Sequence, residues 1–228
     1  MSFLYRRFVD NKQSWCLSNK LGMAVDENGN NIPWFSYSAV DFLQKYCQQH
    51  QNLQVFEFGS GSSTLFFQKQ KYCTFSLETS KTWFNIITQK LSAPTSEAWQ
   101  ENYSGEVWQE NYFSNQITTQ NKINGATVFL LENAYQNPNY YQFLPQNFNS
   151  KQQFDIILVD SLHRLQCVLH SLEFLKPSGL LIVDDFERKN YHKIAQHLAE
   201  KNFCQQNFVD LAVGQLKIKN TAIFSKNY

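Results

Sequence analysis

The sequence predicts one α/β domain, with a mostly parallel seven-stranded sheet, helices on both faces and a C-terminal antiparallel hairpin. Three observations lead to this prediction. Short apolar runs rich in β-branched and aromatic residues alternate with segments of helical length, as expected of a parallel sheet covered by helices. A glycine turn, "GSGSS", follows the first run. Near the end of the chain, Gly214 separates two alternating strands, which is typical of an antiparallel pair.

The individual elements follow in order along the chain. The first strand is expected at Leu53–Phe58, after a helix in "SAVDFLQKYCQQH" and before a helix in "SSTLFFQKQ", whose serines are suited to cap a helix start. The hairpin lies in "NFVDLAVGQLKIKNTAIF". Further strands are expected at Tyr72–Glu78, Ala126–Glu132, Phe154–Asp160 and Gly179–Asp185, and further helices at Ser80–Leu91, about His163–Leu175 and about Lys189–Lys201.

Two segments depart from this alternation within the single domain, residues 1–228. Residues 1–50 are expected to form an N-terminal helical cap. Residues 92–124 are expected to be an insertion, and they contain the repeated heptapeptides "EAWQENY" and "EVWQENY". Two copies are too few for a solenoid. The insertion is either a lid over a substrate or a segment packed on the surface.

Composition excludes some classes of partner. The 20 Lys and Arg residues nearly balance the 19 Asp and Glu residues, so nucleic acid is not expected as a partner. The five cysteines are scattered and never spaced as C-x-x-C, which fits reduced thiols. The chain starts without a signal-peptide core and its apolar runs are of strand length. We therefore expect a soluble, cytoplasmic protein that does not bind membranes, and its oligomeric state is not predicted.

The stretch "FEFGSGSST" places glycines where a ligand would bind a parallel sheet, at the carboxyl end of the first strand. Gly59 adopts a positive φ without penalty, and Gly61 leaves room for a ligand to approach the backbone. A helix beginning near Ser62 points its free N–H groups and positive dipole end at the same place. The turn therefore predicts a site for an anionic group.

Two classes of ligand use such a turn, and two residues separate them. A dinucleotide site prefers a small residue at the sixth position of G-x-G-x-x-G, where this chain has Thr64. A pyrophosphate would also lie near the carboxylate of Glu57, which is unfavourable. A zwitterion such as S-adenosylmethionine avoids both conflicts, since it offers a carboxylate and an ammonium group but no phosphate.

With its E-x-G-x-G pattern, the turn resembles the first motif of class I S-adenosylmethionine-dependent methyltransferases, which have a Rossmann-like fold. Glu78 ends the second strand, 21 residues after Glu57, and "LKPSGLLIVDD" resembles the family's loop and fifth strand, with Ser178 in place of a usual glycine. The terminal hairpin also matches the family. Within it, "EFGSGSST", "SLETSKTWF", "VDSLHRLQC" and "IPWFSYSAVDFL" are similar to a bacterial group with an E-F-G-S-G-x-S-T motif, most of whose members are uncharacterised.

The resemblance implies a set of cofactor-binding residues. Glu78 would hold the two ribose hydroxyls, whereas the hydroxyls of Ser60 and Thr64 are also explained as caps of backbone N–H groups. Thr79 is a weaker candidate for contact with adenosine. The residues implied to bind S-adenosylmethionine are Glu57, Gly59, Ser60, Gly61, Thr64, Glu78 and Asp160.

Three carboxylates, those of Asp160, Asp184 and Asp185, are expected to converge at the ends of neighbouring parallel strands. Hard oxygen ligands suit Mg²⁺ or Ca²⁺, which would bind and acidify a substrate hydroxyl. Catechol-type and macrocin-type O-methyltransferases have metal-binding carboxylates at similar strand ends. Alternatively, these acids contact only the cofactor or the substrate.

Candidates for acid–base catalysis are His163 and Asp160. His163 begins the helix after the fourth strand, where it would face the methyl acceptor as a general base, or it is an exposed residue without a role. Arg164 pairs either with a substrate anion or with protein acids. "NPNY", Asn137–Tyr140, is interpreted as a plain turn. Trp34, Phe35 and Tyr37 either cover a ligand or pack onto the sheet.

The resemblance implies an enzyme that transfers a methyl group from S-adenosylmethionine, with oxygen on a small molecule or sugar as the expected acceptor and Mg²⁺ as a possible second cofactor. One alternative is a domain that binds S-adenosylmethionine without turnover, as a partner or sensor. Another is a nicotinamide-dependent oxidoreductase, which would have to accommodate Thr64, Glu57 and the hairpin.

Overall fold

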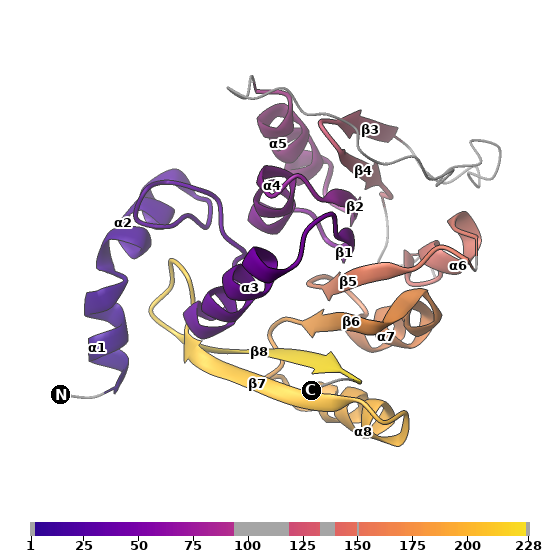
Figure 1. Ribbon diagram of the computed structural model, residues 1–228. Coiled ribbons are helices and arrows are strands. Elements are labelled where there is room, and N and C mark those ends of the chain that lie inside the picture. The colour runs from indigo at the N-terminus through magenta and orange to yellow at the C-terminus, as the bar shows by residue number, and fades with distance from the viewer. Residues whose placement is uncertain (1–2, 94–118, 133–139, 150, 227–228) are drawn as a thin grey trace.

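The computed structural model describes residues 3–93, 119–132, 140–149 and 151–226 (Figure 1). Helices cover both faces of one central sheet, as Figure 1 shows with the sheet seen nearly edge-on. The predicted α/β fold with a C-terminal antiparallel hairpin is therefore confirmed. The number of strands differs from the prediction.

The sheet has eight strands in the order β3-β4-β2-β1-β5-β6-β8-β7. The central strands β4, β2, β1, β5 and β6 run parallel, and β3, β8 and β7 pair antiparallel with their neighbours. The bounds are β1 (Gln54–Phe58), β2 (Cys73–Glu78), β3 (Thr119–Ile123), β4 (Ala126–Leu130), β5 (Phe154–Val159), β6 (Leu175–Val183), β7 (Cys204–Leu211) and β8 (Ile218–Ser225).

Helices α3, α4 and α5 pack on one face of the sheet and α6, α7 and α8 on the other. Side chains alternate between the faces: Val55 of β1 contacts the first group of helices, and Phe56 contacts the second. The bounds are α1 (Phe3–Asp10), α2 (Lys12–Leu21), α3 (Tyr37–Gln49), α4 (Ser62–Lys69), α5 (Lys81–Leu91), α6 (Phe143–Asn147), α7 (Arg164–Ser171) and α8 (His192–Glu200), with 3₁₀ helices η2 (Leu172–Phe174) and η3 (Lys189–Tyr191).

The eighth strand, β3, lies inside the segment that the sequence predicted to be an insertion, so the expected count of seven strands is wrong. A turn at Asn124 and Gly125, with φ of 48° and 79°, joins β3 to β4. Positive φ at both central residues is the geometry of a two-residue type I′ hairpin, for which Asn-Gly is the preferred sequence. The repeated heptapeptides lie outside the described residues.

Two other boundaries differ from the prediction around β6. The helix expected at His163–Leu175 is shorter, because the chain tightens into η2 and β6 begins at Leu175 rather than Gly179. The first part of β6 contains Pro177, which has no N–H to donate to a ladder. The pairing with β5 accordingly shifts register between Phe154 and Ile156.

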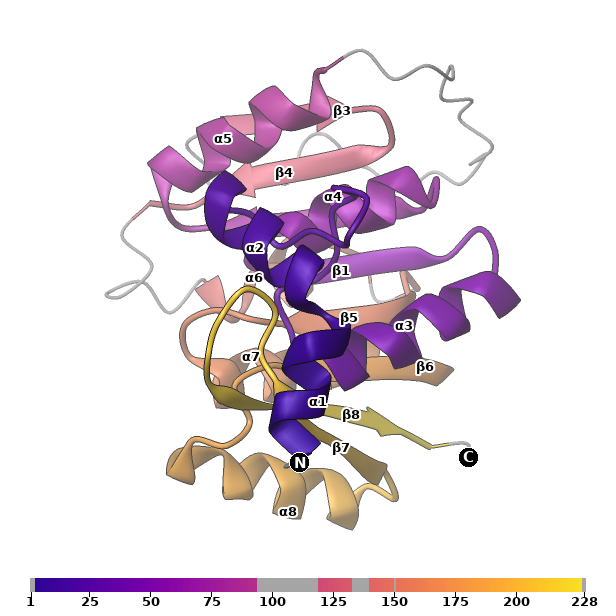
Figure 2. The ribbon, with the colours of Figure 1, turned by 90° about the vertical axis from the view of Figure 1, so that its left-hand side faces the viewer.

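The N-terminal helices cross the face that carries α3 and α4, as the rotated view in Figure 2 shows. Arg7 of α1 donates to the buried carboxylate of Asp210 in β7 and also pairs with Asp41 of α3. An isolated bridge joins Ser36 to Ala212. These contacts fix the cap to the hairpin. Among the helices of the described ranges, none combines the length and apolar character that crossing a bilayer requires.

A substitution at Gly179 tests the close packing at the start of the β6 ladder. An added Cβ would lie 2.8 Å from Leu175 Cδ1 and 3.0 Å from the carbonyl oxygens of Asp155 and Lys176. We expect Gly179→Ala to lower the free energy of unfolding by about 1–3 kcal/mol in urea denaturation. The exposed neighbour Ser178 provides the control, and Ser178→Ala should change it by less than about 0.5 kcal/mol. Equal effects of the two changes would contradict the packing argument.

Candidate functional site

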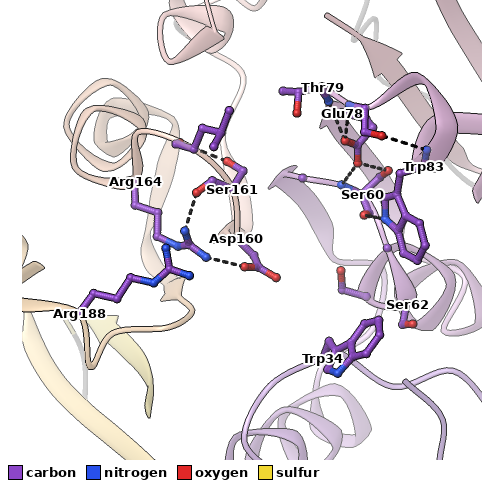
Figure 3. Close-up of a pocket in the computed structure, with 15 residues that line it drawn as sticks. Trp34, Ser60, Ser62, Glu78, Thr79, Trp83, Asp160, Ser161, Arg164 and Arg188 are labelled. Atoms are coloured by element: carbon purple, nitrogen blue, oxygen red, sulfur yellow. Dashed lines mark hydrogen bonds and ion pairs between the residues drawn. The ribbon is translucent and has the colours of Figure 1, made fainter. Parts of the chain in front are cut away.

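A pocket of about 580 Å³ opens at the carboxyl ends of β1, β2 and β5. One wall is formed by the turn after β1, the first turn of α4 and the segment from Glu78 to Trp83 (Figure 3). The other wall carries Asp160, Arg164 and Arg188, and Trp34 lies below (Figure 3). This is the place at which open α/β sheets bind ligands.

The turn after β1 depends on Gly59. Its φ is +104°, and an added Cβ would lie 2.6 Å from the carbonyl oxygen of Asp160. Its N–H donates to the Leu77 carbonyl at 2.9 Å, which ties the turn to β2. Gly61 is different, because its φ of 177° is ordinary extended backbone and a Cβ there would lie 3.7 Å from Trp83 Nε1. Only Gly59 is therefore required by the fold itself.

The carboxylate of Glu78 joins the two loops of this wall. One oxygen accepts hydrogen bonds from the N–H and the hydroxyl of Ser60, at 3.0 Å and 2.7 Å. The other accepts from the N–H groups of Thr79 and Ser80, at 2.7 Å and 2.8 Å. The Trp83 indole donates to the Ser60 carbonyl (Figure 3). Glu78 therefore lies at the pocket with a fixed orientation, and its binding of ribose hydroxyls stays a prediction.

Glu57 and Thr64 do not line the pocket, although the sequence analysis expected both to contact the cofactor. Both side chains are fully buried between β1 and α4. Thr64 donates to Glu57 at 2.7 Å, accepts from the Gly61 N–H at 3.0 Å, and so connects the acid to the turn. Ser76 also donates to Glu57. The two residues hold the turn from beneath, and β1 directs the side chain of Glu57 toward α4 because strand side chains alternate.

Burial raises the pKa of the Glu57 carboxyl from its ordinary value of 4.5 to about 7, against the opposing effect of the hydroxyl hydrogen bonds. Near neutral pH this carboxyl is therefore divided between its charged and neutral forms. The charged form is costly because no basic side chain offsets it among its hydrogen-bond partners, which are hydroxyls.

The structure brings together the three predicted carboxylates of Asp160, Asp184 and Asp185, with one oxygen of each within 4.8 Å of the others. Asp184 is completely buried, whereas the Asp160 side chain is 37% exposed and faces the pocket. Asp185 adopts a positive φ of 53° at the end of β6. This turn directs its carboxylate back toward the cluster.

Basic side chains already neutralise this cluster. Arg164 donates to Asp160 at 2.7 Å and to Asp185 at 3.2 Å, and Arg188 pairs with the same Asp185 oxygen. Lys219 pairs with Asp184 and, at 3.3 Å, with the other oxygen of Asp185. Although burial opposes the shift, these cations hold the pKa of the Asp185 carboxyl below its usual value. Three carboxylates face three cations, so the donor set does not fit the predicted Mg²⁺.

His163 does not face the pocket, contrary to the expectation for a general base. It has a left-handed φ of 53° immediately before α7, and its exposed ring packs edge-on against Tyr141 at a centroid distance of 6.1 Å. Asp160, the other predicted catalytic residue, does line the pocket. The left-handed conformation turns the histidine outward, and a sequence pattern does not reveal such a turn at a non-glycine residue.

Several other predicted residues divide between the pocket and the core. Trp34, Thr79, Ser60 and Arg164 line the pocket, whereas Phe35 and Tyr37 are buried in the core on the face of the sheet that carries α3. Of the "NPNY" segment only Tyr140 is described, and its hydroxyl donates to Ser161 beside the pocket. The sequence analysis did not identify Trp83, Arg188 or Lys219. The available signal for Trp83 was its position three residues after the capping Ser80.

The fold is shared with solved methyltransferase structures of low sequence identity. An O-methyltransferase from Bacillus cereus, solved in complex with SAH, has a TM-score of 0.57 and 13% identity, over 95% of this chain and 91% of that one. TomG, an O-methyltransferase from Streptomyces achromogenes involved in tomaymycin synthesis and solved with SAM, has a TM-score of 0.55 and 10% identity, over 94% and 88%. A putative O-methyltransferase from Klebsiella pneumoniae has a TM-score of 0.52 and 14% identity, over 95% of this chain and 89% of that one.

No protein-family model matches the sequence, and a search of curated proteins finds no match. At 10–14% identity, the structural neighbours show that the chain has a Rossmann-like methyltransferase fold.

The two glycines of the turn should respond differently to the same substitution. We expect Gly59→Ala to lower the free energy of unfolding by at least ~2 kcal/mol, because it combines an unfavourable φ with a backbone clash. Gly61→Ala should change it by less than about 0.5 kcal/mol. Urea denaturation of both variants measures the difference, and a Gly59→Ala protein as stable as Gly61→Ala would refute this account of the turn.

Glu57 should make stability depend on pH. Because its folded pKa is raised from 4.5 to about 7, the charged carboxyl costs stability above that range and costs nothing below pH 4.5. Relative to wild type, Glu57→Gln should therefore raise the free energy of unfolding at pH 8, on the order of 2–3 kcal/mol, and should leave it almost unchanged at pH 4.5. Thermal melts across this pH range measure the difference. Glu173→Gln, at an exposed position, should show no such trend.

Proposed function

We propose that this protein binds S-adenosylmethionine in the pocket and transfers its methyl group to an oxygen atom of a small molecule. The observation that carries the proposal is the composition of one wall, where a helix start, a tight glycine turn and the fixed carboxylate of Glu78 surround one space. The two O-methyltransferases with the same fold, which were solved with SAM or SAH, support the reaction type.

The charged groups of the pocket suit the charges of this cofactor. The first turn of α4, at Ser62 and Ser63, presents the positive end of a helix to the cofactor's carboxylate. The carboxylate of Asp160 lies on the opposite wall. Glu78 is suited to accept hydrogen bonds from ribose hydroxyls, in competition with the Ser60 hydroxyl that it now accepts. The indole of Trp83 offers an apolar surface beside Glu78 for the adenine ring.

In this proposal the protein contributes alignment, desolvation and a proton acceptor. The bound cofactor supplies an activated methyl group on a sulfonium, whose C–S bond breaks as the acceptor's O–C bond forms. The walls of the pocket hold acceptor and methyl in line and exclude water. Asp160 is the proposed acceptor of the hydroxyl proton, because its carboxylate is partly exposed on the wall away from Glu78 and is held in place by Arg164.

The proposal is tested by calorimetric titration of the chelator-treated full-length protein with S-adenosylhomocysteine, with NADH as the competing ligand class. We expect S-adenosylhomocysteine to bind selectively. Glu78→Gln should weaken binding roughly tenfold or more, since an amide accepts fewer hydrogen bonds than a carboxylate. Gly61→Ala should also weaken it, because a methyl group at Gly61 would enter the pocket beside Trp83.

The control for these variants is Glu173→Gln, an exposed change that should leave the affinity unaltered. Folded protein that binds no S-adenosylhomocysteine would sink the proposal, and selective binding of NADH would favour an oxidoreductase. Binding without turnover on any hydroxyl acceptor, in a panel of phenols and sugars, would favour the non-catalytic alternative.

A further inference from the structure

A cluster of three carboxylates at the ends of β5 and β6 requires positive charge. Asp160, Asp184 and Asp185 present oxygens within 4.8 Å of one another, and Asp184 is fully buried. Like charges at this range repel strongly where water is excluded. Proteins compensate such clusters with a metal ion or with basic side chains. The contacts of the individual oxygens decide between the two.

Lys219 of β8 supplies positive charge to two of these carboxylates. Its ammonium group forms an ion pair with Asp184, lies 3.3 Å from Asp185, and donates a hydrogen bond to the Trp34 carbonyl at 2.8 Å. The ammonium group therefore lies beside three oxygen atoms, and its hydrogen bond goes to the Trp34 carbonyl. The residue is only 6% exposed. The neighbouring carboxylates of Asp184 and Asp160 outweigh the effect of burial and raise the pKa of Lys219.

Strand β8 supplies a second group to the same carboxylate. Thr221 lies two residues after Lys219, so both side chains point to the same face of the sheet. The Thr221 hydroxyl donates to the other oxygen of Asp184 at 2.8 Å. One oxygen of Asp184 therefore accepts a hydrogen bond from β8, and the other forms an ion pair with β8. Arg164 and Arg188 bind Asp185 from the pocket side and complete the neutralisation.

A divalent cation does not fit these contacts. Mg²⁺ requires close to six oxygens at about 2.0–2.1 Å, so it would have to displace the ammonium group from Asp184 and Asp185. The site would then hold one more positive charge beside Arg164 and Arg188. Charge and geometry both favour the lysine.

We propose that the ammonium group of Lys219 takes the place of a divalent metal in the Asp160, Asp184 and Asp185 cluster, so that the pocket is assembled without a metal. Lys219 is then a positioning residue. It holds one oxygen of Asp185, whose other oxygen holds Arg164 and Arg188 on the pocket wall. The inference stands apart from the proposed methyl transfer, because it concerns cation binding by the chain alone.

The test measures Mn²⁺ binding by electron paramagnetic resonance on chelator-treated full-length protein, together with melting temperatures with and without Mn²⁺. Wild type should bind no Mn²⁺ below millimolar concentration. In Lys219→Ala the buried carboxylate of Asp184 loses its cation and Asp185 keeps only the two arginines, which should lower the melting temperature. Mn²⁺ should then bind at least about tenfold more tightly than to wild type and raise the melting temperature again.

Three further variants make the result interpretable. Lys217→Ala removes an exposed lysine from the same hairpin and should behave as wild type. Asp184→Asn in the Lys219→Ala background should abolish the acquired binding. Lys219→Gln removes the charge but keeps a donor for the Trp34 carbonyl. It should also gain Mn²⁺ binding, and it replaces the alanine variant in the test if that variant does not fold.

Tight Mn²⁺ binding by wild type that Asp184→Asn removes would overturn the proposal. A folded Lys219→Ala or Lys219→Gln protein that gains neither Mn²⁺ binding nor thermal rescue would also overturn it. Both outcomes are independent of S-adenosylhomocysteine, so failure of the proposed function would be recognised separately.

Discussion

The close approach between the ends of β1 and β5 sets the geometry of the pocket. At Gly59 the backbone passes so near to the Asp160 carbonyl that no side chain fits between them. This approach places the start of α4 opposite Asp160 and leaves Glu78 at the edge of the same space. The hydroxyl of Thr64 and the carboxylate of Glu57 support the turn from below. Each wall therefore depends on a backbone contact that only glycine permits.

Two buried carboxylates lie beneath this pocket, and the protein compensates them differently. Glu57 is surrounded by hydroxyl groups, which solvate the charge only in part, and burial raises its pKa to about 7. Asp184 faces an ammonium group and a hydroxyl from one strand. The first carboxylate has hydroxyl partners and the second also has a cation, and burial raises the pKa of both, in Asp184 against the opposing charge of Lys219. The basic side chains Arg164, Arg188 and Lys219 all pair with acids of the wall that carries Asp160.

The sequence predicts the parallel strands, the glycine turn and the position of Glu78 at a strand end, because periodicity and glycine placement are local properties of the chain. It also brings together Asp160, Asp184 and Asp185, since the ends of parallel strands share one edge. It does not predict contacts that depend on side-chain direction or on distant strands. His163 points away because of an unusual backbone angle, and Lys219 appears as one polar residue of an alternating strand. Asn124–Gly125 is a local sequence signal for the β3–β4 hairpin. The strand before it was not predicted, because it falls in the segment 92–124 that lacks a regular apolar pattern.

The strand order β6-β8-β7 has a consequence for the folding pathway. Strands β7 and β8 are neighbours in sequence, so they close a short loop, whereas β8 meets β6 only after the chain has passed through α8 and β7. Local contacts form sooner than those of high contact order. The hairpin is therefore expected to form first and to dock as a unit. Since docking buries Lys219 against Asp184, the charges at the pocket wall would be paired in a late step, and the rate of that step would depend on ionic strength.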